Sequence, residues 1–490
     1  MTDRAVSAID SLLVPTPTHA PADTAIATVR HPWVAPALVG TALALWLATL
    51  GTVWQLPLHT LPRYYLARYL VLDATSLLFM LVVNTVFLGI CVYLYSRERD
   101  TPALQPDIRS RAALMLGFMA IVNIGLMANH LVLQWGLIEI STLFAAPLVA
   151  RGELPNPRAT AWRYLLYSAI TLALTLIGFM ALAQSAHLRG VEANFMVDTL
   201  GASLTRDPDA WQRLGLSFVL FGLGGKLGLA PMYGWLPETY EAAPTSTSAL
   251  LASVQFNVSM VAVFRILQIF HGTEVGFVSQ ELLVMGYLSL VVAAIQIMAS
   301  SNYKRLIAYA CVSSSGVIAL GLSVGQAAAY GVVLYIVSNA FVKSLLFLTA
   351  GRMRSVYHTN EVGALSGVIR SLPLAGLLFT GGIFALLGFP PFASFLAEML
   401  ILSGIVQAGN LFAFTLMCVM LTVIFVATGR TVFPMLWGEP KVHVDTPKQS
   451  LFTLLPKLGF VAVLVMLGTY TPQAITDLLR AVAVSIGGLP

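Results

Sequence analysis

Residues 216–238 read LSFVLFGLGGKLGLAPMYGWLPE. The run from Leu216 to Leu229 is apolar except for Ser217 and Lys226. A lysine inside a segment of hydrocarbon length costs roughly 3 kcal/mol or more, so its side chain is expected to face a bundle interior or a water-filled path, with a partner. The glycines around Lys226, together with Pro231, allow a helix to loosen, which frees backbone carbonyls and admits water. This stretch therefore predicts a membrane helix that is broken beside a buried charge.

The composition of the whole chain agrees with this prediction. Of its 490 residues, 58% are hydrophobic and 10% are charged, and the mean hydropathy is +0.82. Soluble domains are only about 45–50% apolar. Apolar runs long enough to span a bilayer recur along nearly the whole chain, and the short alternating runs of a β-barrel are not seen. We predict an all-α polytopic membrane protein.

The apolar runs predict about thirteen membrane spans. They cover residues 33–55, 69–97, 110–128, 130–150, 160–185, 215–235, 244–270, 277–300, 302–324, 326–352, 372–406, 409–437 and 452–471. No loop between them is large enough for a soluble domain, so residues 31–490 are predicted to form a single transmembrane domain. Residues 1–30 are polar and rich in Pro and Ala, and we interpret them as a flexible N-terminal extension. The tail 472–488 has helical apolar spacing and is expected to lie on the membrane surface or to pack on a neighbouring helix.

The distribution of basic residues predicts the orientation. Lys and Arg follow the second, fourth, eighth, tenth and twelfth spans, whereas the loops after the third, ninth and eleventh spans have none. By the positive-inside rule the N-terminus is cytoplasmic and the C-terminus periplasmic, in a bacterial inner membrane. Loop 186–213 is an exception, with three arginines. The net charge of +5 therefore reflects topology rather than nucleic-acid binding.

The cysteines give no indication of a metal or redox centre. Cys91, Cys311 and Cys418 all fall inside apolar runs, without CxxC or Cys/His spacing. We expect no disulfide framework, no metal and no bound cofactor.

A second buried charge offers a partner for the lysine. Glu139 lies in the apolar run 129–149, and Glu139 and Lys226 are each near the middle of their run. Desolvation lowers the pKa of a lysine, and a nearby carboxylate raises it. A lysine subject to both influences can hold or release a proton as its partner moves. The other interpretation is a permanent ion pair that locks two helices together. The two charges favour a proton or ion route.

The segment LYIVSNAFVKSLLFL contains a third charge, Lys343. Tyr335, Asn339 and Lys343 are spaced i, i+4 and i+8, which places three polar groups on one helix face. Such a stripe can order a file of water, although a hydrogen-bonding seam between helices has the same pattern. Ser314, in ACVSSSGVIAL, can add a hydroxyl to this path, but serines in membrane helices more often bond to their own backbone.

A fourth charge follows a second Gly/Pro-rich stretch. Glu398 lies ten residues after Gly388 in GFPPFASFLAEMLIL, where Pro390 and Pro391 also interrupt the run. Gly, Pro, an aromatic, Leu and Glu recur here at the offsets they have after Gly228. Paired interrupted spans are typical of internally repeated transporters, although two independent kinks would look the same. Glu398 is interpreted as an exit gate or, alternatively, as an acceptor that stabilises the kink.

Glu139, Lys226, Lys343 and Glu398 could form a row across the middle of the membrane that passes protons sideways. Asp73, by contrast, stands at the head of the second span and is interpreted as a helix cap or dipole partner.

Four stretches of the sequence are similar to those of a known family. They are GGKLGLAPMYGWLPETYEAAPTSTSALLASV, YKRLIAYACVSSSGVIALGL, SNAFVKSLLFLTAGRM and GFPPFASFLAEMLIL. The chain resembles the antiporter-like subunits of respiratory complex I and of group 4 membrane-bound hydrogenases such as formate hydrogenlyase. The likeness extends over about residues 69–440, and GLIEISTLFAAPLVA and ATAWRYLLYSAI are closer to the hydrogenase branch.

The resemblance implies a 14-helix fold with two inverted five-helix repeats, about residues 110–270 and 277–437, each with a broken helix. It also implies a Glu–Lys pair, a central Lys and a terminal Lys or Glu, which correspond to Glu139, Lys226, Lys343 and Glu398. Members of the family conduct protons when a redox arm elsewhere in their complex is driven.

The sequence departs from the family at several relay positions. Many members have His where Tyr233 and Ser314 stand, and His often replaces Tyr335 and Asn339. A Tyr hydroxyl would act as a relay rather than as a charge carrier. The link between Lys226 and Lys343 would then depend on water and hydroxyl groups.

Taken together, the sequence predicts a proton-translocating membrane subunit of a multisubunit complex, with no redox site of its own. Other membrane and peripheral subunits are expected as partners. One alternative is a cation/proton antiporter subunit. Others are a membrane partner in a bicarbonate-uptake complex with a zinc-binding subunit, and a hydrogenase-related complex without its metal centre. A structural membrane scaffold with frozen ion pairs is an alternative of a different class.

Overall fold

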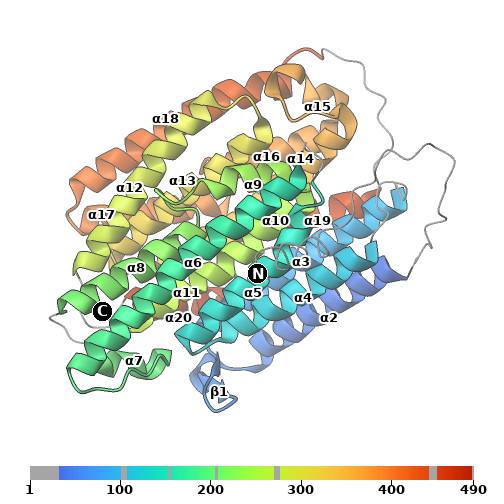
Figure 1. The fold of residues 1–490 in the computed structure, drawn as a ribbon. Coiled ribbons are helices and arrows are strands. Elements are labelled where there is room, and N and C mark those ends of the chain that lie inside the picture. Colours follow the sequence, from blue (N-terminus) through green and yellow to red (C-terminus); the bar gives the residue numbers. More distant parts are fainter. Residues whose placement is uncertain are drawn as a thin grey trace.

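The protein forms a single bundle of long helices that run side by side (Figure 1). A computed structural model of the chain describes residues 33–100, 108–152, 156–204, 208–269, 276–440 and 450–487. The predicted extension 1–30 lies outside the described residues. Within them, eleven helices are long and apolar enough to cross a membrane. The chain is a multi-pass, all-helical membrane protein, as predicted.

The first half of the bundle contains the elements up to residue 269. They are α2 (Val34–Gln55), the 3-10 turn η1 (Leu58–Thr60), β1 (Arg63–Tyr65), β2 (Leu70–Leu72), α3 (Ala74–Asp100), α4 (Ile108–Met127), α5 (Leu131–Val149), α6 (Pro157–Leu188), α7 (Val197–Ser203), α8 (Ala210–Lys226), α9 (Trp235–Ala242), α10 (Thr245–Leu250), the π-helical segment η3 (Leu251–Gln255) and α11 (Phe256–Ile269).

The second half contains the remaining elements. They are α12 (Gly276–Ala299), α13 (Tyr303–Ser323), α14 (Gln326–Tyr357), η4 (Val362–Ala364), α15 (Val368–Ser371), α16 (Pro373–Leu386), α17 (Ala393–Gln407), α18 (Leu411–Trp437), α19 (Leu451–Thr469) and α20 (Gln473–Gly487).

The thirteen predicted spans correspond to these helices with few corrections. Eleven match the long apolar helices, and the other two, 215–235 and 372–406, are the broken pairs α8/α9 and α16/α17. The span predicted to begin at residue 69 begins at Ala74, because residues 63–72 form an antiparallel hairpin that pairs Arg63 with Leu72. Apolar β-branched residues alone do not distinguish such a short strand from the start of a helix.

The two helix breaks have the same local backbone structure. Each helix ends in a glycine with a left-handed backbone, Gly228 at φ +76° and Gly388 at φ +66°. The next amide in each break bonds five residues back, Leu229 to the Gly224 carbonyl and Phe389 to the Phe384 carbonyl. This is the Schellman ending, in which a glycine avoids the clash of a Cβ atom. The sequence echo therefore reflects a repeated structure, while the inverted arrangement of residues 110–270 and 277–437 stays a prediction.

Two features of the packing position the buried charges. Helix α14 is buried along its whole spanning window and contacts α3, α10, α13, α16, α17, α19 and α20. Helices α6 and α8 approach closely at glycines: a Cβ on Gly178 would lie 2.6 Å from the Gly215 carbonyl oxygen. Small residues of this kind bring membrane helices together. The tail helix α20 packs on α14 and α3, which decides between its two predicted positions.

Candidate ion path

Lys226 ends helix α8, directly before the first break, and its side chain is buried. The ammonium donates hydrogen bonds to Thr142 Oγ1 at 2.5 Å and Ser168 Oγ at 2.6 Å. It also lies 5.1 Å from the centre of the Tyr164 ring. These groups come from α5 and α6, so the close α6–α8 packing supplies part of the site. The hydroxyls and the ring replace part of the hydration that a buried ammonium loses.

Glu139 lies on α5 one turn before Thr142, half-buried. Its carboxylate interacts electrostatically with Lys226, yet the ion pairs found among the described residues do not include this one. Glu139 Oε2 is buried, without a hydrogen-bond partner in the described part of the chain. Glu139 and Lys226 thus interact, as expected, but they do not form a salt bridge. The Lys226 ammonium is bonded to the Thr142 hydroxyl instead.

Side chains take up the backbone groups that the first break frees. Ser315 donates to the Leu227 carbonyl at 2.8 Å, and Trp235 Nε1 donates to the Gly225 carbonyl at 2.9 Å. The Ala230 amide donates to Ser289 Oγ at 2.8 Å. Such satisfaction is what permits an interrupted helix at membrane depth. Tyr233, predicted as a relay, is half-buried in this segment, and the hydrogen bonds described for Lys226 do not include it.

Lys343 lies in the middle of α14 and is completely buried. Its ammonium lies 4.2 Å from the centre of the Phe256 ring and has no hydrogen-bond acceptor among the described residues. Phe256 follows the π-helical segment η3, where the wider turn interrupts the helix. Isolated π turns occur often at functional sites.

The polar stripe on α14 is bonded mainly within its own helix. Asn339 Nδ2 donates to the Tyr335 carbonyl at 2.9 Å. Ser314 Oγ donates to its own Ala310 carbonyl and to Asn339 Oδ1, at 2.9 and 3.0 Å. The stripe therefore combines the backbone bonding typical of membrane helices with one bond that joins α13 to α14.

Glu398, on α17, is buried against the second break. A Cβ on Gly388 would lie 2.1 Å from Glu398 Oε2, so only glycine leaves room for the carboxylate. Glu398 and Tyr335 interact and line a cavity of about 30 Å³ together with Ser313, Ser314 and Thr428. A polar cavity of this size has room for one or two water molecules. Pro390 and Pro391 lie at the surface of the break.

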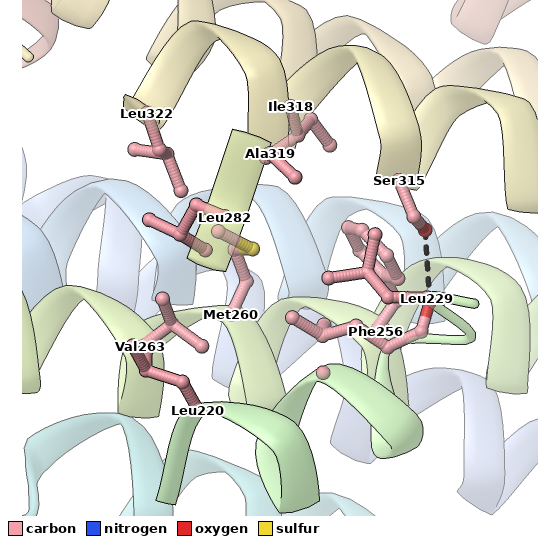
Figure 2. Close-up of a pocket in the computed structure, with 12 residues that line it drawn as sticks. Leu220, Leu229, Phe256, Met260, Val263, Leu282, Ser315, Ile318, Ala319 and Leu322 are labelled. Carbon is pink, nitrogen blue, oxygen red and sulfur yellow. Dashed lines mark hydrogen bonds between the residues drawn. The ribbon is translucent and has the colours of Figure 1, made fainter. Parts of the chain in front are cut away.

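A small apolar cavity lies beside the first break. Its volume is about 10 Å³, and it is lined by Leu227, Leu229, Phe256 and other apolar side chains. Figure 2 shows Ser315 at its edge, bonded to the backbone. A cavity of this size and lining stays dry.

Two buried cations were not singled out from the sequence. Arg265, on α11, is 2% exposed and forms an ion pair with Asp73. Lys457, on α19, is fully buried, lies 5.2 Å from the centre of the Tyr93 ring and has no acceptor within the described ranges. The signal that identified Lys226 was present in both cases, since both residues fall inside predicted spans.

Asp73 has both a capping and a pairing role. Its Oδ1 accepts a hydrogen bond from the Ser76 amide at 2.8 Å, which confirms the predicted helix cap. Burial alone would raise the pKa of the Asp73 carboxyl, but the Arg265 guanidinium and the bonds from Ser76 hold this pKa below its ordinary value. The carboxylate is therefore charged at neutral pH.

Among the described residues, no group of three or more His, Cys, Asp or Glu side chains is placed to hold a metal ion.

The chain is similar to known membrane proteins over most of its length. Residues 128–426 match the family described as NADH:quinone oxidoreductase/Mrp antiporter, TM. The chain is 26% identical to a hydrogenase-4 component F homolog of Methylacidiphilum infernorum, over 84% of this chain and 87% of that protein. It is 24% identical to a Na(+)/H(+) antiporter subunit of Bacillus subtilis, over 78% of this chain and 76% of that protein.

Solved structures share the fold. A chain of the membrane-bound sulfane sulfur reductase, an archaeal respiratory membrane complex, superposes with a TM-score of 0.82 at 21% identity, covering 93% of this chain and 92% of that one. A chain of the Mrp complex from a Dietzia species gives 0.80 at 19% identity, covering 94% of each. With the family match over more than half of its length, the chain belongs to the NADH:quinone oxidoreductase/Mrp antiporter family of membrane subunits.

Proposed function

We propose that this chain is the proton-translocating membrane subunit of a multisubunit redox-driven or hydrogenase-related complex. Protons would move through Glu139, Lys226, Lys343 and Glu398 with the help of water. The hydroxyl and amide groups of Tyr233, Ser314, Tyr335 and Asn339 would assist as relays. The chain itself would hold no redox centre, and its energy would come from reactions in partner subunits.

One observation supports this proposal above the others. Lys226, Lys343 and Glu398 are buried at membrane depth, and the described ion pairs include none of the three. A structural scaffold would fix such charges in permanent pairs, because an unpaired buried charge destabilises a fold. Lys226 instead lies at the first break and Glu398 packs against the second, while the ammonium of Lys343 lies against Phe256, which follows η3. Irregular backbone at membrane depth is typical of ion sites in transporters.

Cation/proton exchange is the second candidate, favoured by the similarity to the Na(+)/H(+) antiporter protein of Bacillus subtilis. It would use the same residues, with Na⁺ as the ion that is exchanged for protons. A role beside a soluble bicarbonate-converting protein would use them as well, with inorganic carbon as the linked chemistry. In each case the proposed partners are other membrane and peripheral subunits together with the surrounding lipid.

The proposed location is a bacterial inner membrane, with the N-terminus cytoplasmic and the C-terminus periplasmic. Two of the three arginines of the exceptional loop 186–213 have partners among the described residues. Arg189 lies 3.9 Å from Asp209, and Arg213 donates to the Pro208 carbonyl.

The experiment is a flux measurement on the intact complex. The complex is purified through a tag on this chain, its subunits are identified, and it is reconstituted in liposomes that enclose a pH-sensitive dye. We expect Glu139→Gln to abolish most of the proton uptake that the partner subunits drive. Glu192→Gln, at an exposed site, is the matched control and should leave uptake unchanged. Full uptake in Glu139→Gln would refute the proposal and favour a scaffold.

A further inference from the structure

A further cavity lies apart from the four central charges. It has a volume of about 370 Å³ and is lined by Asp73, Asn129, Asp198 and Arg265, among other residues. Its walls come from the β1–β2 hairpin, the starts of α3 and α7, and the ends of α11 and α20. These parts lie on the side opposite to the basic loops, where the proposed topology places the periplasm. The cavity is therefore a polar recess on the outer side of the protein.

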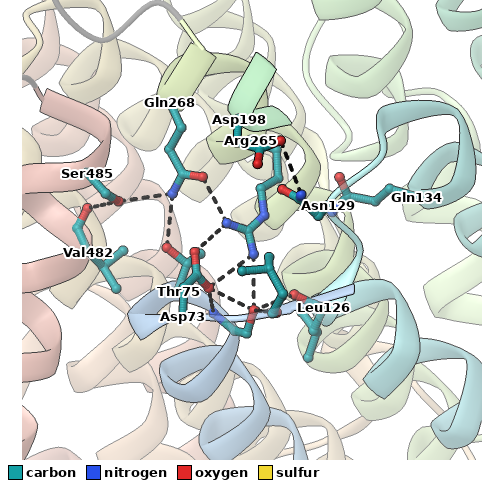
Figure 3. A network of polar contacts seen from close by, with 12 residues as sticks. Asp73, Thr75, Leu126, Asn129, Gln134, Asp198, Arg265, Gln268, Val482 and Ser485 are labelled. Atoms are coloured by element: carbon teal, nitrogen blue, oxygen red, sulfur yellow. Dashed lines mark hydrogen bonds and ion pairs between the residues drawn. The ribbon is translucent and has the colours of Figure 1, made fainter. Parts of the chain in front are cut away.

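The floor of this recess is a closed polar network (Figure 3). Arg265 pairs with Asp73 through both terminal nitrogens, and also donates to Gln268 Oε1 at 2.9 Å and Ser76 Oγ at 3.0 Å. Gln268 Nε2 donates onward to Thr75 and Ser485, each at 3.0 Å. The network joins α3, α11 and α20. Asp73 is 21% exposed and Arg265 only 2%, so the pair lies between the open recess and the interior.

Buried polar groups continue from this floor toward the membrane centre. On α11 and η3 they are Ser259 and Gln255, and on the facing side of α5 they are Gln134 and Ser141. Ser141 Oγ donates to Gln255 Oε1 at 3.0 Å, which joins the two helices. Gln134 and Ser141 are spaced i and i+7, so they lie on the same face of α5. From Arg265 to Gln255 the helix rises about 15 Å, half of a hydrocarbon core of about 30 Å.

Several atoms along this line are buried polar groups without a partner in the described part of the chain. They are Arg265 Nε, Gln134 Oε1 and Gln255 Nε2. Buried polar atoms are nearly always hydrogen-bonded, and water is small enough to satisfy them where protein groups do not. The line ends beside the central charges. Ser141 directly precedes Thr142, which accepts a hydrogen bond from Lys226 Nζ at 2.5 Å. On the other face of η3, Ser253 bonds Ser344, the neighbour of Lys343, at 2.8 Å.

We infer that the recess is the outer mouth of a water-filled access path that leads along α5, α11 and η3 to the central charges. The Asp73–Arg265 pair is its gate. The species that passes is water with its protons, or a small cation. The purpose of the path rests on the proposed function. The path itself is tested by the accessibility of a thiol, which needs no measurement of proton flux.

The test measures access to a thiol placed behind the gate. Ser259→Cys is made in a chain whose three cysteines, Cys91, Cys311 and Cys418, are replaced by alanine, within the intact complex in sealed right-side-out membrane vesicles. Ag⁺ is added from outside; it is small enough for a narrow water path. It forms an Ag–S bond and releases the thiol proton. The thiols left unreacted are then counted with a maleimide after denaturation.

Two reporters serve as controls. Ser485→Cys, at the mouth, should react fast. Thr380→Cys on α16 is buried and, like Ser259, bonded to its own helix, but it lies off the path and should not react. We expect Ser259→Cys to react from outside at a rate between the two.

The gate is tested by Asp73→Asn, which removes the charge and keeps the shape. It should raise the rate at which Ag⁺ reacts with Ser259→Cys by about tenfold or more, and leave the rate at Thr380→Cys unchanged. A tenfold change corresponds to a closed state weakened by about 1.4 kcal/mol. Asp73→Glu keeps the charge and should have a smaller effect.

Equal rates at Ser259→Cys and Thr380→Cys in the native chain, or reaction of Ser259→Cys only from the inner side, would overturn the path. That comparison stands even if Asp73→Asn fails to assemble. An unchanged rate in an assembled Asp73→Asn complex would overturn the gate. If Glu139→Gln left flux intact while Ser259→Cys reacted as expected, the proposed function would fail and the access path would stand.

Discussion

The Lys226 ammonium donates hydrogen bonds to Ser168 and to Thr142, one helical turn after Glu139, rather than to the Glu139 carboxylate. The Thr142 hydroxyl therefore holds the ammonium on the helix that carries its electrostatic partner. A proton on Lys226 is stabilised without being locked into an ion pair. This relationship makes the hydroxyl itself a target for mutation.

Thr142→Val, which keeps the side-chain shape, should lower proton uptake by about tenfold or more, because a hydrogen bond to a charged group contributes about 1.5–3 kcal/mol. Thr142→Ser restores the hydroxyl and should retain most of the uptake. The measurement is dye-reported uptake by the reconstituted complex. Equal uptake in the Val and Ser variants would mean that the bond to Thr142 has no part in transfer.

Gly388→Ala tests the second break. The new methyl group would lie 2.1 Å from Glu398 Oε2, at a left-handed backbone position, so the carboxylate must shift. We expect a loss of uptake together with destabilisation by about 1–2 kcal/mol. Gly381→Ala, on α16, meets nothing within 4 Å and is the matched control. The thermal unfolding temperature of the complex in detergent reports the stability part, and an unchanged temperature and uptake would contradict the geometry.

Ser315→Ala removes the donor that satisfies the Leu227 carbonyl at the first break. A buried carbonyl left without a partner costs about 1–3 kcal/mol, so the unfolding temperature should fall. Ser338→Ala removes a hydroxyl that bonds only to its own helix at Tyr335, and should have little effect. Similar temperatures for the two variants would show that the break does not need this bond.

Lys457→Met removes a buried ammonium that has no acceptor within the described ranges. Replacing an unpaired buried charge with an apolar chain of similar length is expected to leave stability unchanged or to raise it. The unfolding temperature of the assembled complex measures this directly. A clear decrease would show that Lys457 has a stabilising partner in the assembly.

The parts of the fold that follow from side-chain chemistry were predictable from the sequence. Hydropathy located the spans, and the Gly/Pro stretches after Lys226 and before Glu398 located both breaks. The β1–β2 hairpin was missed, because β2 (Leu70–Leu72) is apolar and reads as the beginning of a helix, while β1 (Arg63–Tyr65) falls in a predicted loop. Of the thirteen predicted spans, eleven are long apolar helices and two are the broken pairs.

The sequence singles out the charged residues of the candidate site, whose roles stay a prediction, but it does not give their bonding. Sequence position places Glu139 and Lys226 at similar depth, but cannot show that Thr142 and Ser168 bind the ammonium. The π-helical turn beside Lys343 has no sequence signal, since it depends on how α11 packs. Arg265 was overlooked although it lies in a predicted span, and its pairing with Asp73, 192 residues away, is set by tertiary packing alone.

The complete burial of α14 has a consequence for the behaviour of the protein in different lipids. The helix that holds Lys343 touches protein along its whole spanning window, so acyl-chain length and headgroup type reach it only through the surrounding helices. Peripheral helices such as α2 and α18, which expose much of their surface, would absorb a change in bilayer thickness by tilting. The central lysine should thus keep its surroundings from one host membrane to another.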